Sequence, residues 1–244
     1  ARRRALLERS FHDAIEQDSF EVLFQPIASL RTRAVVGFEA LARCDHPRLG
    51  PISPEIFIPL AEQTGLIEAV SDQVLRKATA HAARWPAHLS LAFNLSARHV
   101  GRPGVERDIF LALHRSGLSP RQLVIEITET AIMSDCAAAA HVVSALKRVG
   151  VRVALDDFGS GYSSFGQLAE LSIDKLKIDR AFVQRIEDDE KSRSIVRAIT
   201  GMCADLGVVC RTERDDMATL SGGNQQKVMV ARWMSQPASL FILD

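Results

Sequence analysis

Short apolar stretches rich in β-branched residues recur along the chain and are separated by stretches with helical periodicity. The predicted strands cover residues 22–27, 35–41, 89–95, 123–128, 151–155, 175–178 and 208–210. Between most of them, apolar residues recur three and four positions apart, as in Val70, Val74 and Leu75. Residues 5–17 have the same helical spacing. Strands that alternate with helices predict parallel β–α units.

This alternation predicts an α/β fold of the (β/α)8-type, a TIM-like barrel, rather than an open doubly wound sheet. Seven strands in roughly 210 residues suit such a barrel. An open dinucleotide-binding sheet would carry a glycine-rich fingerprint after its first strand, and the sequence has none.

Composition narrows the function classes. The 244 residues hold 30 Lys and Arg against 30 Asp and Glu, and a net charge of zero argues against binding to a nucleic-acid polymer. No run of apolar residues is long enough to predict a membrane segment or a signal peptide. The four cysteines have neither disulfide nor metal-site spacing, which favours a cytoplasmic location. Because the sequence begins without Met, we expect it to be the excised cytoplasmic part of a larger sensor protein.

Polar side chains lie at or near the ends of successive predicted strands. They are Gln25, Glu39, Arg43, Asn94, Glu126, Glu129, Asp156, Asp157, Lys177 and Asp179. Barrel active sites lie at the carboxyl ends of the strands, so we expect this set on one rim. Clustered acids repel one another unless cations neutralise them, and hard oxygen donors favour Mg²⁺ or Mn²⁺. Two such ions about 3.5–4 Å apart would suit phosphodiester hydrolysis. A single acid at a strand end is more often a helix N-cap or a rim salt bridge, but several in step with a lysine on the next strand favour a shared site.

Residues 38–41, Phe-Glu-Ala-Leu, resemble the signature of the EAL domain family, the bacterial cyclic di-GMP phosphodiesterases of second-messenger signalling. Further stretches fit the family in order. They are residues 25–27, 46–67, 94–96, 126–129, 156–159 and 176–179. The resemblance covers about residues 19–210.

The resemblance implies a (β/α)8 barrel that hydrolyses cyclic di-GMP to linear pGpG with two divalent ions, Mg²⁺ or Mn²⁺. It implies these metal ligands: Glu39, Asn94, Glu126, Asp156 and, for the second ion, Asp157. It also implies that Lys177 orients or deprotonates the attacking water and that Glu129 braces the loop after the fifth strand. Gln25, Leu41 and Arg43 would contact the dinucleotide. A homodimer is a further expectation, since such domains often pair.

The C-terminal residues depart from this family. Arg211 stands where the family has a metal-binding Glu, although Glu213 lies on the same strand face. Residues 220–227 resemble the signature motif of ABC transporter ATPases, and residues 239–244 resemble a Walker B strand. The chain lacks the GxxxxGK[ST] phosphate loop, so no ATP binding is expected.

We therefore divide the chain into a linker helix over 1–18, a truncated EAL-type barrel over 19–210 and an ABC-ATPase-like tail over 211–244. The last helix–strand unit of the barrel is missing or replaced by this tail. Arg211 leaves two functions open. One is a phosphodiesterase with reduced or lost activity, and the other is a non-catalytic module that binds cyclic di-GMP or another protein.

Overall fold

The main feature of the fold is a mixed sheet, seen in a computed structural model that describes residues 11, 13–29, 32–46, 50–158, 171–184 and 188–205. The described strands are β1 (Glu21–Ala28), β2 (Val35–His46), β3 (Gly50–Ile52), β4 (Ser90–Leu95), β5 (Leu123–Thr128), β6 (Arg152–Phe158) and β7 (Lys175–Ile178). Their order is β1-β2-β4-β5-β6-β7, with β3 paired to β2. From β2 through β7 the main strands are parallel, as the sequence predicts.

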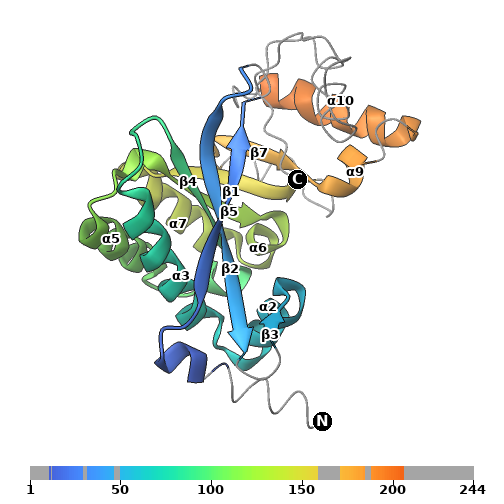
Figure 1. Ribbon diagram of the computed structural model, residues 1–244. Coiled ribbons are helices and arrows are strands. Elements are labelled where there is room, and N and C mark those ends of the chain that lie inside the picture. Colours follow the sequence, from blue (N-terminus) through green and yellow to red (C-terminus); the bar gives the residue numbers. More distant parts are fainter. Residues whose placement is uncertain are drawn as a thin grey trace.

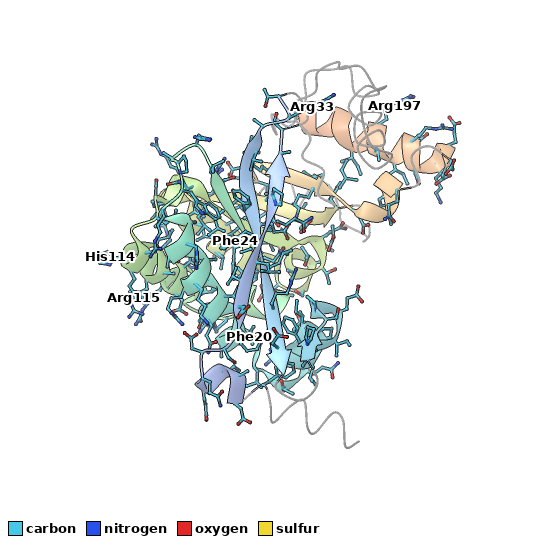
Figure 2. The ribbon with its side chains drawn as sticks, viewed as in Figure 1. Phe20, Phe24, Arg33, His114, Arg115 and Arg197 are labelled. Atoms are coloured by element: carbon cyan, nitrogen blue, oxygen red, sulfur yellow. The ribbon has the colours of Figure 1, made fainter. Side chains whose placement is uncertain are left out.

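Helices follow the strands and cover the sheet. They are α2 (Pro54–Thr64), α3 (Ile67–Ala82), α4 (Ala97–Val100), α5 (Val105–Ser116), η1 (Pro120–Gln122), α6 (Glu129–Ser134), α7 (Cys136–Arg148), α9 (Arg180–Gln184) and α10 (Glu190–Asp205). Figure 1 shows α3, α5 and α7 lying together along the sheet. His114 and Arg115, in the last turn of α5, point away from the sheet (Figure 2). Among the described helices, none combines the length and apolar composition that crossing a lipid bilayer needs.

The sequence-based expectation for the first strand is wrong in one respect. β1 runs antiparallel to β2, so Gln25 lies within the strand and opposite Glu39 rather than at the carboxyl end of a parallel strand. Only residues 29–34 join the two strands, and a parallel crossover needs a dozen residues or more. Two strands with so short a connection must form a hairpin.

Other predicted elements lie close to their observed positions. β2 runs on to His46, and β6 runs on to Phe158, so Asp156 and Asp157 belong to the strand itself. Residues 11 and 13–16 are helical, within the helix predicted over 5–17. The predicted strand at 208–210, Arg211, Glu213 and the ABC-like tail lie outside the described residues, as does the loop at 159–170.

The two faces of the sheet pack separately. The larger core fills the space between sheet and helices and includes Phe57, Val74, Leu91 and Phe93. A second cluster contains Ile27, Ala92, Val124 and Ala154, each from a different strand. Small residues on the inner face suit the curved interior of a TIM-like fold. Polar residues of the predicted site lie on the same face of the sheet, each two positions after Ala92, Val124 or Ala154.

Candidate active site

Lys177 joins carboxylates from three strands. Its Nζ, on β7, donates hydrogen bonds to Glu126 Oε2 of β5 at 2.6 Å and to Asp156 Oδ2 of β6 at 2.7 Å. Glu39 Oε2 of β2 lies 3.7 Å from the same nitrogen. The side chains of all four residues are at most 16% exposed. The structure thus brings together four of the residues that the sequence placed on one rim.

Asn94 extends this cluster to β4. Its Nδ2 donates a hydrogen bond of 2.6 Å to Glu39 Oε1. Asn94 and Glu126 are register partners on neighbouring parallel strands, which explains why their side chains share one face. With this bond, β2, β4, β5, β6 and β7 each contribute one polar side chain to the same group.

Burial and mutual charge shift the acid–base equilibria of this group. Burial raises the pKa of the Glu126 carboxyl to about 7, with Lys177 opposing the shift and Glu39 and Asp156 adding to it. Burial alone lowers the pKa of a lysine, but Glu126, Asp156 and Glu39 hold the pKa of Lys177 above its ordinary value. Lys177 is therefore an ammonium at neutral pH. One positive charge stands against three acidic groups.

Asp157 and Glu129 lie beside the cluster in different settings. Asp157 is exposed, adopts a φ of 54°, and donates its backbone N–H to Asp156 Oδ1 at 2.9 Å. Burial of part of its carboxyl, together with Asp156 and Asp179, raises its pKa. A positive φ at a non-glycine residue is strained and recurs at functional sites. Glu129 is 2% exposed at the start of α6, and the loop that it is expected to brace lies outside the described residues.

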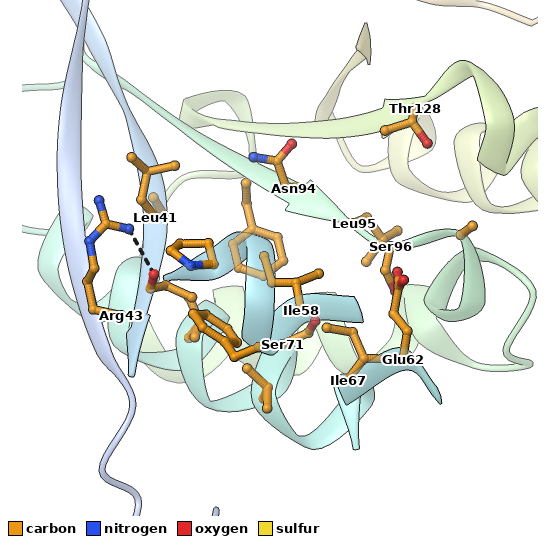
Figure 3. A pocket seen from close by; sticks show the side chains of 18 of the residues that line it. Leu41, Arg43, Ile58, Glu62, Ile67, Ser71, Asn94, Leu95, Ser96 and Thr128 are labelled. Carbon is orange, nitrogen blue, oxygen red and sulfur yellow. Dashed lines mark hydrogen bonds between the residues drawn. The ribbon is translucent and has the colours of Figure 1, made fainter. Parts of the chain in front are cut away.

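A pocket of about 420 Å³ opens next to the cluster. Figure 3 shows Leu41 and Arg43 of β2 on one side and Asn94, Leu95 and Ser96 at the end of β4 opposite. Residues from α2 and α3 complete its walls: Pro54, Phe57, Ile58, Glu62, Ile67, Val70, Ser71 and Val74. Arg43 Nη1 donates to the Ala42 carbonyl at 2.9 Å and so is held at the edge of the pocket (Figure 3).

Sequence reasoning placed Leu41, Arg43 and Asn94 at this site but missed its helical wall. Phe57, Val70 and Val74 have the apolar spacing of ordinary core residues, and all three are buried. Nothing in that spacing distinguishes a residue that lines a pocket from one that fills a core. Ser71 is a polar residue on the buried side of α3 and lines the pocket, but Thr79 is also buried on the same helix and does not line it.

The donor atoms fit a hard divalent cation, because carboxylate and amide oxygens are the ligands that Mg²⁺ and Mn²⁺ prefer. In the described part of the chain, no three acidic, histidine or cysteine side chains have the arrangement of a metal site. The Lys177 ammonium lies among the carboxylates instead. An ion would have to share these carboxylates with Lys177.

Comparison with known proteins identifies the family. The model of the EAL domain matches residues 8–213. The chain belongs to the EAL domain family. The match takes in residues 8–18, which were predicted to form a linker helix, and extends past Arg211 to Glu213.

The curated relatives of this EAL domain are longer proteins, and the chain matches one part of each. An uncharacterized signaling protein of Caulobacter vibrioides is 42% identical over 207 residues, 85% of this chain and 26% of that protein. A cyclic di-GMP phosphodiesterase of Pseudomonas aeruginosa is 35% identical over 78% of this chain and 33% of that protein. The chain spans about a quarter to a third of the length of the curated relatives it matches.

Solved structures of EAL proteins share the fold. The PaMucR phosphodiesterase in its c-di-GMP complex superposes with a TM-score of 0.82 at 30% identity, covering 96% of this chain and 97% of that one. The FimX EAL domain from Pseudomonas aeruginosa, bound to c-di-GMP, gives 0.79 at 24% identity over 97% of this chain and 92% of that one. These neighbours support the TIM-like α/β fold predicted from the sequence.

Proposed function

We propose that this EAL domain binds cyclic di-GMP and is built for its metal-dependent hydrolysis to pGpG. The observation that carries the proposal is the convergence of Glu39, Glu126 and Asp156 on Lys177 beside a pocket of about 420 Å³. The relative from Pseudomonas aeruginosa named as a cyclic di-GMP phosphodiesterase and the c-di-GMP complex of PaMucR support the choice of ligand.

Charge explains why cations are needed. Cyclic di-GMP carries two phosphodiester anions, whereas the cluster holds three carboxylates against one ammonium. Like charges brought into a buried site repel one another strongly. We infer that Glu39, Asn94, Glu126 and Asp156 hold a divalent ion, with Asp157 reaching a second. Divalent ions held there would supply positive charge to the phosphodiester and to the water that attacks it.

The chain's own residues then orient the reaction. Lys177 donates to Glu126 and Asp156 and thereby fixes two carboxylates from different strands. Its remaining proton can point at the attacked phosphate or at water, so we assign it an orienting role. Arg43, at the edge of the pocket, would pair with a phosphate, while Leu41 and the apolar walls would take a base. We further propose that Gln25 contacts the dinucleotide. Glu129 would brace the loop at 159–170.

The test is hydrolysis of cyclic di-GMP in Mg²⁺ or Mn²⁺, followed by chromatography of the product. Binding is measured separately by calorimetry. The proposal expects the chain to bind cyclic di-GMP. Where hydrolysis occurs, pGpG should be the product, and EDTA should abolish the hydrolysis. Absence of both binding and hydrolysis would contradict the proposal.

A non-catalytic binding module is the second candidate, and Arg211 favours it. An arginine in place of a ligand carboxylate removes one negative charge and adds a positive one near divalent ions. Leu41, Arg43 and the rest of the described pocket lining are present in this chain. Saturable binding without turnover would therefore assign this function.

We also propose a foreign origin for residues 211–244, on the resemblance of residues 220–227 to an ABC ATPase signature. Without a phosphate loop this segment is expected to bind no ATP. Micromolar ATP affinity that is lost in Ser221→Ala would contradict that expectation. A cytoplasmic location and a homodimer complete the proposal, and light scattering would test the latter.

A further inference from the structure

Leu23 on β1 is an exposed leucine beside the candidate site. Its side chain is 51% exposed, although the neighbouring strand residues Phe24 and Ile27 are half-buried and buried. A single exposed leucine on a protein surface is not by itself a sign of function. The position of Leu23 on the hairpin is informative, because β1 and β2 present alternate residues to opposite sides.

Ring contacts show which residues of the β1–β2 hairpin face the helices and which face the candidate site. Phe24 and Phe38 both contact Trp85, at centroid distances of 5.1 Å and 4.9 Å, after the end of α3. Their strand neighbours must face the other way. On that side Glu39 reaches Lys177, and Gln25 is the register partner of Glu39. Leu23 shares this face with Gln25.

Leu23 is also the register partner of Leu41. Side chains of directly opposed residues have Cβ atoms about 4.5–5.5 Å apart, so the two leucines adjoin. Leu41 lines the pocket, and the next pair along the hairpin is Glu21 with Arg43. The leucine pair therefore lies between the carboxylate cluster and the Arg43 guanidinium.

We propose that Leu23 and Leu41 form an apolar shelf that contacts one face of a purine base of the bound dinucleotide. Leu23 is thus a ligand-positioning residue contributed by β1. The inference rests on the proposed function and deepens it. An apolar shelf between two charged groups suits a ligand that combines flat bases with charged phosphates, whereas a simple phosphate would gain nothing from it.

The experiment compares Leu23→Ala, Leu23→Arg and Leu23→Met in the 244-residue chain, with cyclic di-GMP as the probe in Mg²⁺ buffer. Removing the leucine side chain should raise the Kd roughly 5- to 10-fold, given the apolar area it offers. Leu23→Arg should raise it further, and Leu23→Met should retain near-normal affinity. Where hydrolysis is measurable, KM should rise while kcat stays the same, because the contact is made before and during reaction alike.

Leu111→Ala is the matched control. Leu111 is 40% exposed on α5, in the outer helix layer (Figure 1), and its removal should leave the Kd unchanged. The unfolding midpoint of each variant is measured as well, and unchanged midpoints would exclude loss of structure as the cause of a higher Kd. Equal affinity in Leu23→Ala, Leu23→Arg and the unaltered chain would contradict the shelf alone. No binding by the unaltered chain would contradict the proposed function as well.

Discussion

At the scale of single residues, Lys177 balances the charges of the site. It donates to Glu126 and Asp156, while Glu39 lies 3.7 Å away. These groups are buried from water, so the Lys177 ammonium offsets much of the repulsion between the converging carboxylates. Removing one partner of a buried ion pair typically costs about 3–5 kcal/mol.

Lys177→Met is accordingly predicted to lower the unfolding midpoint in EDTA and to abolish any hydrolysis. Mg²⁺ should raise the midpoint of this variant more than that of the unaltered chain, because the ion can neutralise the same carboxylates. Differential scanning fluorimetry with and without Mg²⁺ measures both effects. Lys147→Met is the control, since the side chains of Lys147 and Asp174 are 31% and 27% exposed, so that water screens this pair more than the buried cluster. Equal Mg²⁺ responses in Lys177→Met and the unaltered chain would count against the prediction.

At the scale of elements, α4 carries a buried histidine that faces α3. His99 is 2% exposed, and burial lowers its pKa to about 4, with Arg102 acting in the same direction and Asp108 against it. Its Nε2 lies 3.1 Å from an Arg102 nitrogen and 3.7 Å from Asp72 Oδ1, and Glu68 faces Arg102. The imidazole is therefore neutral in the fold.

This arrangement predicts acid sensitivity. A histidine whose folded pKa is lowered stabilises the fold above its unfolded value of 6.5, and that contribution is lost as pH falls toward about 4. The loss amounts to about 3 kcal/mol at most. His99→Gln should be less stable at neutral pH but should lose less free energy of unfolding between these limits. Urea titrations across this range measure the difference, and identical pH slopes in both proteins would argue against His99 as the source.

The end of α2 makes a second prediction at this scale. Gly65 caps the helix with a φ of 75°, in the left-handed region that an L side chain rarely adopts. Gly65→Ala should cost about 1–2 kcal/mol of unfolding free energy. Gly101, which caps α4, has a φ of −73°, and an added Cβ there would meet its nearest atoms at 3.8 Å. Gly101→Ala should be neutral or slightly stabilising by urea denaturation, and similar losses at both positions would contradict the argument.

At the scale of the whole molecule, Arg211 is the residue that we propose decides between enzyme and binding module. Two unit charges 4 Å apart interact by about 4 kcal/mol at an effective dielectric of 20. An arginine at the position where the family resemblance expects a ligand glutamate would therefore be repelled by divalent ions or would displace one. Arg211→Glu is predicted to raise the rate of cyclic di-GMP hydrolysis by at least about tenfold while leaving the Kd little changed. Product formation measured by chromatography checks it. Rapid turnover by the unaltered chain, insensitive to Glu213→Gln, would overturn this account.

Local pattern determined much of this protein. The alternation of apolar runs and helical spacing is set by neighbouring residues, so the strands from β2 to β7 and most helices could be predicted from it. The sequence also marked Glu39, Asn94, Glu126, Asp156 and Lys177, because parallel strands bring their carboxyl ends to one edge.

Tertiary structure decided how these parts meet. The antiparallel direction of β1 follows from a short connection, and only the resulting register sets Leu23 beside Leu41 and Gln25 beside Glu39. The pocket arises where α2 and α3 pack against β2 and β4, and the same apolar spacing would have served a filled core. The sequence indicated that cations must neutralise the acids, whereas the folded chain sets its own Lys177 among them. Periodicity fixes which face a residue occupies, but its distance to a residue on another strand depends on how the whole sheet curves.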